Sequence, residues 1–293
     1  MLIYNAKIVT PGEKIIENGY INIENGVITD VGEGKTDGNY DAGGGFAVPG
    51  FTDAHTHLGM NVYEGENNID FSDRYFDLAE KSGVCAVGIS PVSREVIGGE
   101  VFAVSTVTKK IIKKSAFKLS AGENPRKHTG LTDSEIHKTI REFKSDLPLH
   151  IHAHAKSDID ALPKNAMLVH GTEGYGHKKI MAGPMLTDIS KSEMEALSYE
   201  NLYKQYKSGA EIAIISDHPE TPVNYLLLYA QLAAKYGVSF DDALKMITVN
   251  AAAMLGIDES YGKIKPGYKS GVLIFDRHPI DFYSKMISSF LWI

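Results

Sequence analysis

The sequence predicts an α/β fold: a shortened (β/α)8 TIM-like barrel with a small discontinuous β domain built from both chain ends. From about residue 47 onward, short apolar runs typical of strands alternate with segments of helical periodicity, as in parallel β/α architectures. About eight such runs are present, which is the strand number of this barrel. A strand-rich segment precedes them, and 293 residues accommodate one barrel with one small addition.

The first 48 residues are expected to form a meander of strands. Their short apolar runs are separated by turn signals such as Asn18-Gly19 and Asn25-Gly26. Near the other end, the apolar run Val272–Phe275 follows Lys265-Pro266-Gly267 and is predicted to return to this meander. The predicted division is therefore 1–48 for the first part of the β domain, 49–257 for the barrel and 258–293 for the second part of the β domain.

The barrel elements follow one another in alternation. Thr132 begins a clear helix, and Glu135 completes a capping box with it. Only about eleven residues separate Ala155 from the strand that begins at Met167, too few for a full helix and its two loops. Strands are predicted at 46–57, 84–89, 101–107, 119–121, 149–154, 167–170, 180–185 and 212–216, and helices at 74–81, 133–144, 192–207, 223–236 and 240–254.

Composition argues against several classes of partner. A net charge of -7 without a long basic stripe argues against nucleic acid. No run of 18 apolar residues is present, which argues against a membrane partner. The single cysteine, Cys85, and an N-terminus without a secretory pattern favour a cytoplasmic location. A small-molecule substrate is the expected partner, and the sequence leaves open whether the chain forms a homo-oligomer.

Two histidines close the first predicted barrel strand. His55 and His57 are two residues apart, so their side chains share one face of the strand. Both imidazoles are then directed to one point at the C-terminal end of the barrel, where active sites of this fold lie. By itself this His-Thr-His pair is a weak indication of a metal site.

A second strand carries three histidines on one face. His150, His152 and His154 alternate with Leu149 and Ile151, and the outer two lie roughly 13 Å apart at the rise of a β-strand. All three therefore cannot bind one ion at about 2 Å. The position of the active end favours His152 or His154 as a ligand, and His150 is interpreted as an interior histidine.

Two further polar residues stand where apolar strands stop. His170 ends Met167–Val169, and Asp217 follows Ile212–Ser216. Singly, each is better explained as a capping or hydrogen-bonded residue. Together with the histidine strands they indicate one metal site, and a set of imidazole and carboxylate ligands favours zinc, with iron and manganese as alternatives.

These motifs resemble those of the metal-dependent amidohydrolase superfamily. The segment Val48–His57 resembles its first-strand signature, and the later motifs occur in the family's order. The His-Ala-His strand and the run His-Gly-Thr-Glu from His170 are most similar to the imidazolonepropionase-like and prolidase-like branch. The resemblance covers essentially the whole chain and includes, in order, His152, His170-Gly171, Asp217, Thr248–Ala252 and Gly262–Gly267.

The resemblance implies an enzyme that hydrolyses a carbon–nitrogen bond through a metal-activated water. It favours His152 over His154 as the ligand on the fifth strand. Asp217 would also be the general base, and His170 would bind a second metal or contact the reacting carbonyl. The implied metal ligands are His55, His57, His152, His170 and Asp217, and the candidate substrate contacts are His154, Glu123, Glu173 and His218.

The sequence departs from the family's pattern in three ways. Binuclear members carry a bridging, carboxylated lysine on an earlier strand, whereas Gly98-Gly99-Glu100 leads into the next strand with no lysine before Lys109. One ion is therefore favoured over two, with Glu123 as an alternative bridging carboxylate. Ala155 replaces the glutamate of the deaminases, which favours amide, lactam or peptide-like substrates. The chain is also short for the family, so a catalytically weak or inactive relative that binds a ligand or partner is the alternative function.

Overall fold

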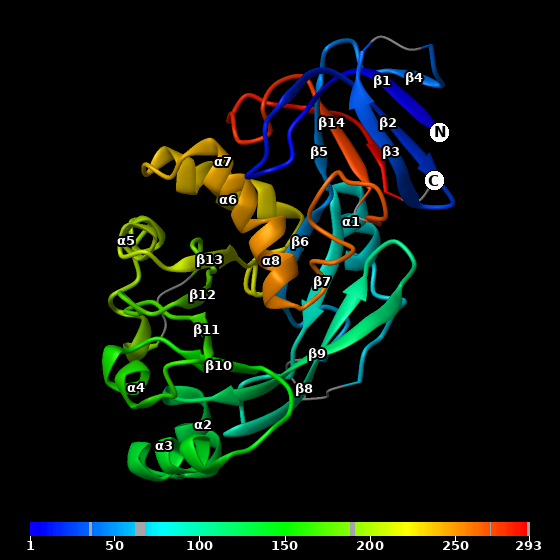
Figure 1. Cartoon of the computed structure of the whole chain (residues 1–293). Coiled ribbons are helices and arrows are strands. Elements are labelled where there is room, and N and C mark those ends of the chain that lie inside the picture. The colour runs from blue at the N-terminus through cyan, green and yellow to red at the C-terminus, as the bar shows by residue number, and fades with distance from the viewer. Residues whose placement is uncertain (35–36, 62–67, 188–190, 270, 292–293) are drawn as a thin grey trace.

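Two sheets organise the molecule (Figure 1). The computed structural model describes residues 1–34, 37–61, 68–187, 191–269 and 271–291. One sheet has eight strands in the order β13-β12-β11-β10-β9-β8-β7-β6 and curves into the barrel. The other collects strands from the two ends of the chain. The predicted α/β fold class is confirmed.

The second sheet joins the beginning of the chain to its end. Its order is β15-β14-β5-β1-β2-β3, with β4 beside β1. Val272–Phe275 forms β14 and pairs antiparallel with β5, so the predicted return of this segment to the meander is confirmed. The bounds of the domain division itself stay a prediction. The strands are β1 Leu2–Ile8, β2 Ile16–Glu24, β3 Val27–Glu33, β4 Tyr40–Asp41, β5 Phe46–Pro49, β14 Val272–Phe275 and β15 Met286–Phe290.

The barrel strands are parallel except for one. β8 runs antiparallel to both of its neighbours, β7 and β9, whereas every other ladder in this sheet is parallel. The strands are β6 Phe51–Thr56, β7 Val84–Ile89, β8 Ile97–Ser105, β9 Lys110–Ser120, β10 Leu149–Ala153, β11 Met167–His170, β12 Lys179–Ala182 and β13 Glu211–Ile214. Counted around the ring, β10 is the fifth strand, β11 the sixth and β13 the eighth.

The β8–β9 hairpin is the main departure from the expected strands. The sequence predicted strands at 101–107 and 119–121, but β8 begins at Ile97 and β9 covers Lys110–Ser120. The first residues of β9 are largely exposed, and its last residues are buried. Its lysine-rich beginning therefore lacks the apolar pattern by which strands are predicted.

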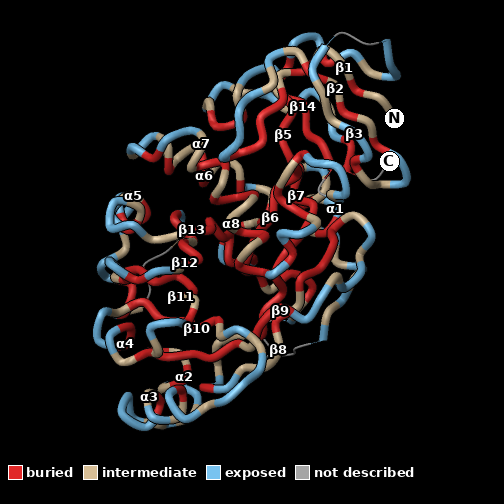
Figure 2. The backbone as a smooth tube through the Cα atoms, viewed as in Figure 1, coloured by how far each residue is buried: buried red, intermediate tan, exposed pale blue. Residues whose placement is uncertain are grey.

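Short helices cover the outside of the barrel, and the barrel strands are mostly buried (Figure 2). The capping box of Thr132 and Glu135 is confirmed in α3. The long helices predicted at 192–207 and 240–254 are wrong as continuous elements, since each is divided in two. No described helix is long and apolar enough to cross a membrane. The helices are α1 Tyr75–Lys81, α2 Glu123–Thr129, α3 Asp133–Glu142, α4 Lys156–Ala161, η1 Ser192–Met194, α5 Asn201–Lys207, η2 Val223–Tyr225, α6 Leu226–Lys235, α7 Phe240–Met246 and α8 Val249–Met254.

The ring closes between β6 and β13 without a regular ladder between these two described strands. The buried carboxylate of Asp53 on β6 accepts hydrogen bonds from the backbone N–H of Ser216, at 3.2 and 3.3 Å. Beyond the strand ends, His57 N donates to His218 O at 2.8 Å and Asp217 N donates to His55 O at 3.3 Å. These bonds hold the end of the last barrel strand against the end of the first.

Close approach of β6 and β7 requires a glycine at position 88. A Cβ atom there would lie 2.3 Å from the Ala54 carbonyl oxygen and 2.7 Å from a Leu255 methyl group. Gly88→Ala is therefore expected to lower the free energy of unfolding by about 1–3 kcal/mol, because it overpacks a core that cannot yield easily. Urea denaturation of the variant and the wild type checks this. Equal stability would show that the two strands separate freely.

Candidate metal and active site

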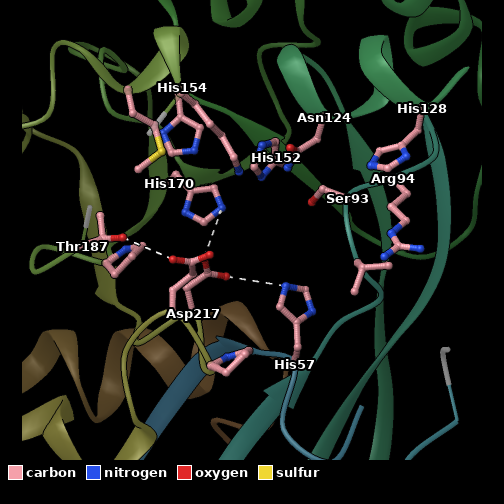
Figure 3. A pocket seen from close by; sticks show the side chains of 16 residues that line it. His57, Ser93, Arg94, Asn124, His128, His152, His154, His170, Thr187 and Asp217 are labelled. Atoms are coloured by element: carbon pink, nitrogen blue, oxygen red, sulfur yellow. Dashed lines mark hydrogen bonds and ion pairs between the residues drawn. The ribbon is translucent and has the colours of Figure 1, made fainter. Parts of the chain in front are cut away.

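Four histidines and one aspartate meet at the C-terminal ends of the barrel strands. Figure 3 shows His57, His152, His170 and Asp217 of this group. His55 lies on β6, and His57 lies just after it; His152 lies on β10, and His170 ends β11. Asp217 follows β13 and lies among them. Its Oδ1 is 3.3 Å from His55 Nε2 and 3.7 Å from His57 Nε2, and its Oδ2 is 3.9 Å from His170 Nε2.

Two overlapping groups of three residues have the spacing of metal ligands. In the group His55, His170 and Asp217, and in the group His152, His154 and His170, one ligand atom from each residue lies within 4.8 Å of the others. Both His152 and His154 therefore face the cluster. His150 lies deeper, with its Nε2 donating to the Met254 carbonyl oxygen at 3.2 Å, as expected of an interior histidine.

The backbone is unusual at two of the site residues. His170 has φ of 70° and Asp217 has φ of 55°, both in the left-handed region that residues other than glycine rarely adopt. Each stands at the point where its strand stops and the chain turns away. Such conformations persist where the surrounding structure enforces them, and they are concentrated at functional sites.

Backbone and hydroxyl groups orient three of the histidine rings. His57 Nδ1 donates to the Ser90 carbonyl oxygen at 2.6 Å, and His170 Nδ1 donates to the Gly183 carbonyl oxygen at 2.7 Å. His154 Nδ1 is hydrogen-bonded to Thr172 Oγ1 at 2.8 Å. Because one ring nitrogen is engaged in each case, the other nitrogen, Nε2, is left to face the cluster.

The donor set fits a divalent cation. Both ring nitrogens of His55 and of His152, and Oδ1 of Asp217, are buried without a hydrogen-bond partner among the described residues. Burying such groups unpaired costs free energy, and a cation among them would satisfy several at once. Imidazole nitrogens with one carboxylate are ligands of zinc and of similar metals.

The electrostatics of the cluster keep these groups in their ligating forms. Burial lowers the pKa of His154 to about 4 and holds the pKa of His55, His152 and His170 well below the ordinary value. Burial also opposes the charge of Asp217, but neighbours led by His170 outweigh it and lower the pKa of this carboxyl. Neutral imidazoles therefore surround an ionised carboxylate at neutral pH.

The sequence indicated no bridging lysine in the segment that leads from Gly98 to Lys109, but the structure places a lysine inside the barrel on the following strand. Lys118 on β9 is fully buried and pairs in register with His150 on β10. Its Nζ has no hydrogen-bond partner among the described residues. Burial lowers the pKa of Lys118 to about 8, against the attraction of Asp217. The reason for favouring one ion over two is thereby removed.

A cavity of about 270 Å³ opens over the cluster. His57, His170 and Asp217 lie on one side of it, and Arg94 and His128 lie on the opposite side (Figure 3). The opposite wall therefore carries basic groups and faces the candidate reaction centre. The volume suits a ligand of modest size.

Of the four predicted substrate contacts, only His154 lines this cavity. The Glu123 carboxylate accepts hydrogen bonds from Ser192 and pairs with Lys127. Glu173 Oε2 accepts a hydrogen bond from the backbone N–H of Lys156 at 2.9 Å. The His218 ring lies against Tyr75, with the ring centroids 4.4 Å apart. The contacts of these three residues are thus made within the protein.

Sequence reasoning missed three buried residues close to the cluster. Lys118 was missed because the beginning of its strand is polar, although alternation along β9 from Ser120 back to Lys118 would have placed it inside. Asp53 precedes His55 by two residues on the same face of β6, which was a usable signal. Glu193, whose Oε1 lies 3.8 Å from His152 Nε2, lies in the short η1 segment, where no local pattern distinguishes it from a surface glutamate.

The fold and the site together define the class of this protein. It is a TIM-like barrel with a candidate metal centre of imidazole and carboxylate groups at its strand ends. Residues 100–290 match the Amidohydrolase family. The chain belongs to this family.

Curated relatives match over shorter stretches. The chain is 37% identical over 109 residues to an imidazolonepropionase of Bacteroides thetaiotaomicron. The matched stretch covers 28% of this chain and 25% of the imidazolonepropionase. The chain is also 41% identical over 69 residues to a 5-methylthioadenosine/S-adenosylhomocysteine deaminase of Bacillus cereus. That stretch covers 21% of this chain and 16% of the deaminase. The chain thus spans a quarter or less of the length of these relatives.

Solved structures match over nearly the whole chain. An amidohydrolase from Thermotoga maritima superposes with a TM-score of 0.86 at 26% identity, covering 99% of this chain and 97% of that one. A Xaa-Pro dipeptidase with bound methionine superposes with a TM-score of 0.65 at 15% identity, covering 96% and 95%. The second likeness concerns the fold alone.

The buried histidines make the stability of metal-free protein depend on pH. The pKa of His150, His154 and His218 is lowered to about 4, chiefly by burial, and returns to about 6.5 on unfolding. Between these values the unfolded chain binds more protons, so the free energy of unfolding should fall as pH falls from about 6.5 to about 4. The slope is about 1.4 kcal/mol per pH unit for each such proton.

The carboxyl group of Asp53 changes the free energy of unfolding in the opposite direction as pH falls. Burial raises the pKa of Asp53 to about 7, so this group retains a proton in the folded state and offsets one histidine. Urea titrations of metal-free protein across this pH range measure the net effect. Stability that stays constant or rises on acidification would contradict the buried, neutral state of the histidines.

Proposed function

We propose that this protein hydrolyses a carbon–nitrogen bond of an amide, lactam or peptide-like small molecule through a metal-activated water. The observation that supports this most directly is the cluster of buried, unpaired imidazole and carboxylate atoms at the strand ends of an amidohydrolase-family barrel. The imidazolonepropionase and deaminase relatives are, by name, enzymes of carbon–nitrogen chemistry.

His55, His57 and Asp217 would hold one divalent ion, most naturally zinc, and His152 and His170 would hold a second. Lys118 lies on an earlier strand, as the bridging lysine of binuclear family members does, and its low pKa favours the neutral amine that carboxylation requires. His170 lies within 4.8 Å of ligand atoms from both sets, of His55 and Asp217 on one side and of His152 on the other, which supports two adjacent ion positions. When bound, such ions supply Lewis acidity and lower the pKa of a coordinated water from about 15.7 toward about 7.

Asp217 is the proton carrier of the proposed reaction. Its low pKa leaves it ionised, and its φ of 55° directs it from the end of β13 toward the histidines. It would accept a proton from the attacking water as the carbon–oxygen bond forms, and deliver it to the leaving nitrogen as the carbon–nitrogen bond breaks. His170, on the neighbouring side, is placed to stabilise the developing negative charge on the carbonyl oxygen.

The alternative function is a relative that binds a ligand or partner without turnover. One of the two observations that favoured this alternative no longer holds. The alternative rested on a missing interior lysine and on compressed helices, and Lys118 is present. The short α4, of six residues, leaves the ligand side chains of β10 and β11 in place. A binding protein also has no need to keep unpaired histidines buried, since apolar residues would be more stable there.

Asp217→Asn separates the two roles of this residue. Asparagine keeps the shape and one coordinating oxygen but is a poor base, so the fold and much of the metal should remain. The value of kcat should fall by roughly 10²–10⁴-fold, the usual contribution of general acid–base catalysis. Metal content and turnover are measured on one preparation, against a panel of N-acyl amino acids, dipeptides, lactams and imidazolones. Retained metal with near-normal kcat would remove Asp217 from the mechanism.

Lys118→Met tests the second ion. Methionine fills a similar buried volume without the amine, so elemental analysis should find about two equivalents of metal in the wild type and about one in the variant. Lys110→Met, on the exposed beginning of the same strand, is the matched control and should leave the content unchanged. Equal metal content in Lys118→Met and wild type would exclude lysine as a bridging ligand.

A further inference from the structure

A buried glutamate outside the predicted site faces one of its histidines. Glu193 lies in η1, on the connection between β12 and β13, and its side chain is 4% exposed. Its Oε1 lies 3.8 Å from Nε2 of His152 and has no hydrogen-bond partner among the described residues. Both ring nitrogens of His152 are also buried without a partner there. Two complementary polar groups therefore face each other without a direct contact.

The pattern among the other histidines indicates what this pair is for. His57, His154 and His170 each have one ring nitrogen hydrogen-bonded to an oxygen of a neighbouring element, at 2.6 to 2.8 Å. Metal-binding histidines nearly always have such a partner, because it fixes the tautomer and the ring orientation. His55 and His152 both lack one, and for His152 the Glu193 carboxylate oxygen is a buried acceptor that faces the ring.

The protein holds Glu193 in this position by a reciprocal pair of contacts. Glu193 Oε2 accepts a hydrogen bond from the backbone N–H of Glu123 at 2.6 Å. Glu123 Oε2 in turn accepts hydrogen bonds from Ser192 N at 3.1 Å and Ser192 Oγ at 3.0 Å. The start of α2 and the η1 segment are thus joined by two carboxylates, each of which accepts hydrogen bonds from the other segment. Glu193 Oε1 is left to face His152.

Gly122 leaves the space that this contact needs. A Cβ atom at this position would lie 2.1 Å from Glu193 Oε2, and the φ of 92° is one that other residues rarely adopt. The backbone at the start of α2 is therefore shaped so that a carboxylate can approach it closely. Glu123, predicted as a site residue, would then act on the site through Glu193.

We propose that Glu193 is the positioning residue of His152, with its Oε1 accepting the Nε2 hydrogen while the other ring nitrogen faces the cation. This rests on the proposed metal-dependent function. The present separation of 3.8 Å would shorten to about 2.8 Å, the usual length of a charge-assisted hydrogen bond, as the ring turns toward the ion. Glu193 thereby ties the β12–β13 connection to the geometry of the metal site.

The experiment compares Glu193→Gln with Glu195→Gln. Glutamine keeps the shape and the oxygen that accepts from Glu123 N, but it removes the charge. Glu195 lies two residues further on, is exposed, and provides a matched control. Zinc affinity is measured by competition with a chelator, and cobalt-loaded protein is followed by its visible spectrum. Neither measurement requires turnover.

Glu193→Gln is expected to bind zinc about 10- to 100-fold more weakly than Glu195→Gln, the usual effect of losing such a partner. Thermal unfolding of the two metal-free variants should agree, and the cobalt bands should keep their shape because the ligands are unchanged. Equal zinc affinities would overturn the role of Glu193 alone. A changed cobalt coordination would also overturn it, since Glu193 would then be a ligand. Wild-type protein that takes up no metal would instead overturn the proposed function, and this inference with it.

Discussion

The junction of β6 and β13 is the contact on which the site depends, because these strands bring site residues together from opposite ends of the barrel sequence. No regular ladder joins them, so the Asp53 carboxylate and two backbone bonds beyond the strand ends hold them together. One of those bonds joins Asp217 N to His55 O, which brings the side chains of the two residues to a short separation. If the barrel opened between β6 and β13, the Asp217 carboxylate would move away from the two histidines at the end of β6.

The cluster of histidines and Asp217 is maintained at the expense of stability. Imidazoles and a carboxylate are buried without partners, and His170 and Asp217 have left-handed backbone conformations. Both features cost free energy, and proteins retain them where function requires them. The surrounding contacts compensate in part: backbone carbonyl groups orient His57 and His170, and a threonine hydroxyl orients His154. The preorganised rings then need little rearrangement when an ion arrives.

The irregular side of the barrel has a chemical consequence. The β8–β9 hairpin replaces the helix that would otherwise connect two parallel strands, and it delivers Lys118 to the interior beside His150. The connection from β12 to β13 is irregular as well, and it delivers Glu193 to the other side of the cluster. The regular strands thus carry the histidines and Asp217. The two irregular segments place Lys118 and Glu193 beside them.

The sequence alone determined the barrel, the β domain shared by both chain ends, and the strand-end residues His55, His57, His152, His170 and Asp217. These follow from local rules: period-two alternation decides which side chains share a face, and polar residues at strand ends stand out against apolar runs. Only the tertiary structure decided that Glu193 faces His152 and that Glu123 contacts Ser192. Those positions depend on contacts between segments far apart in the chain, and no local pattern encodes such contacts.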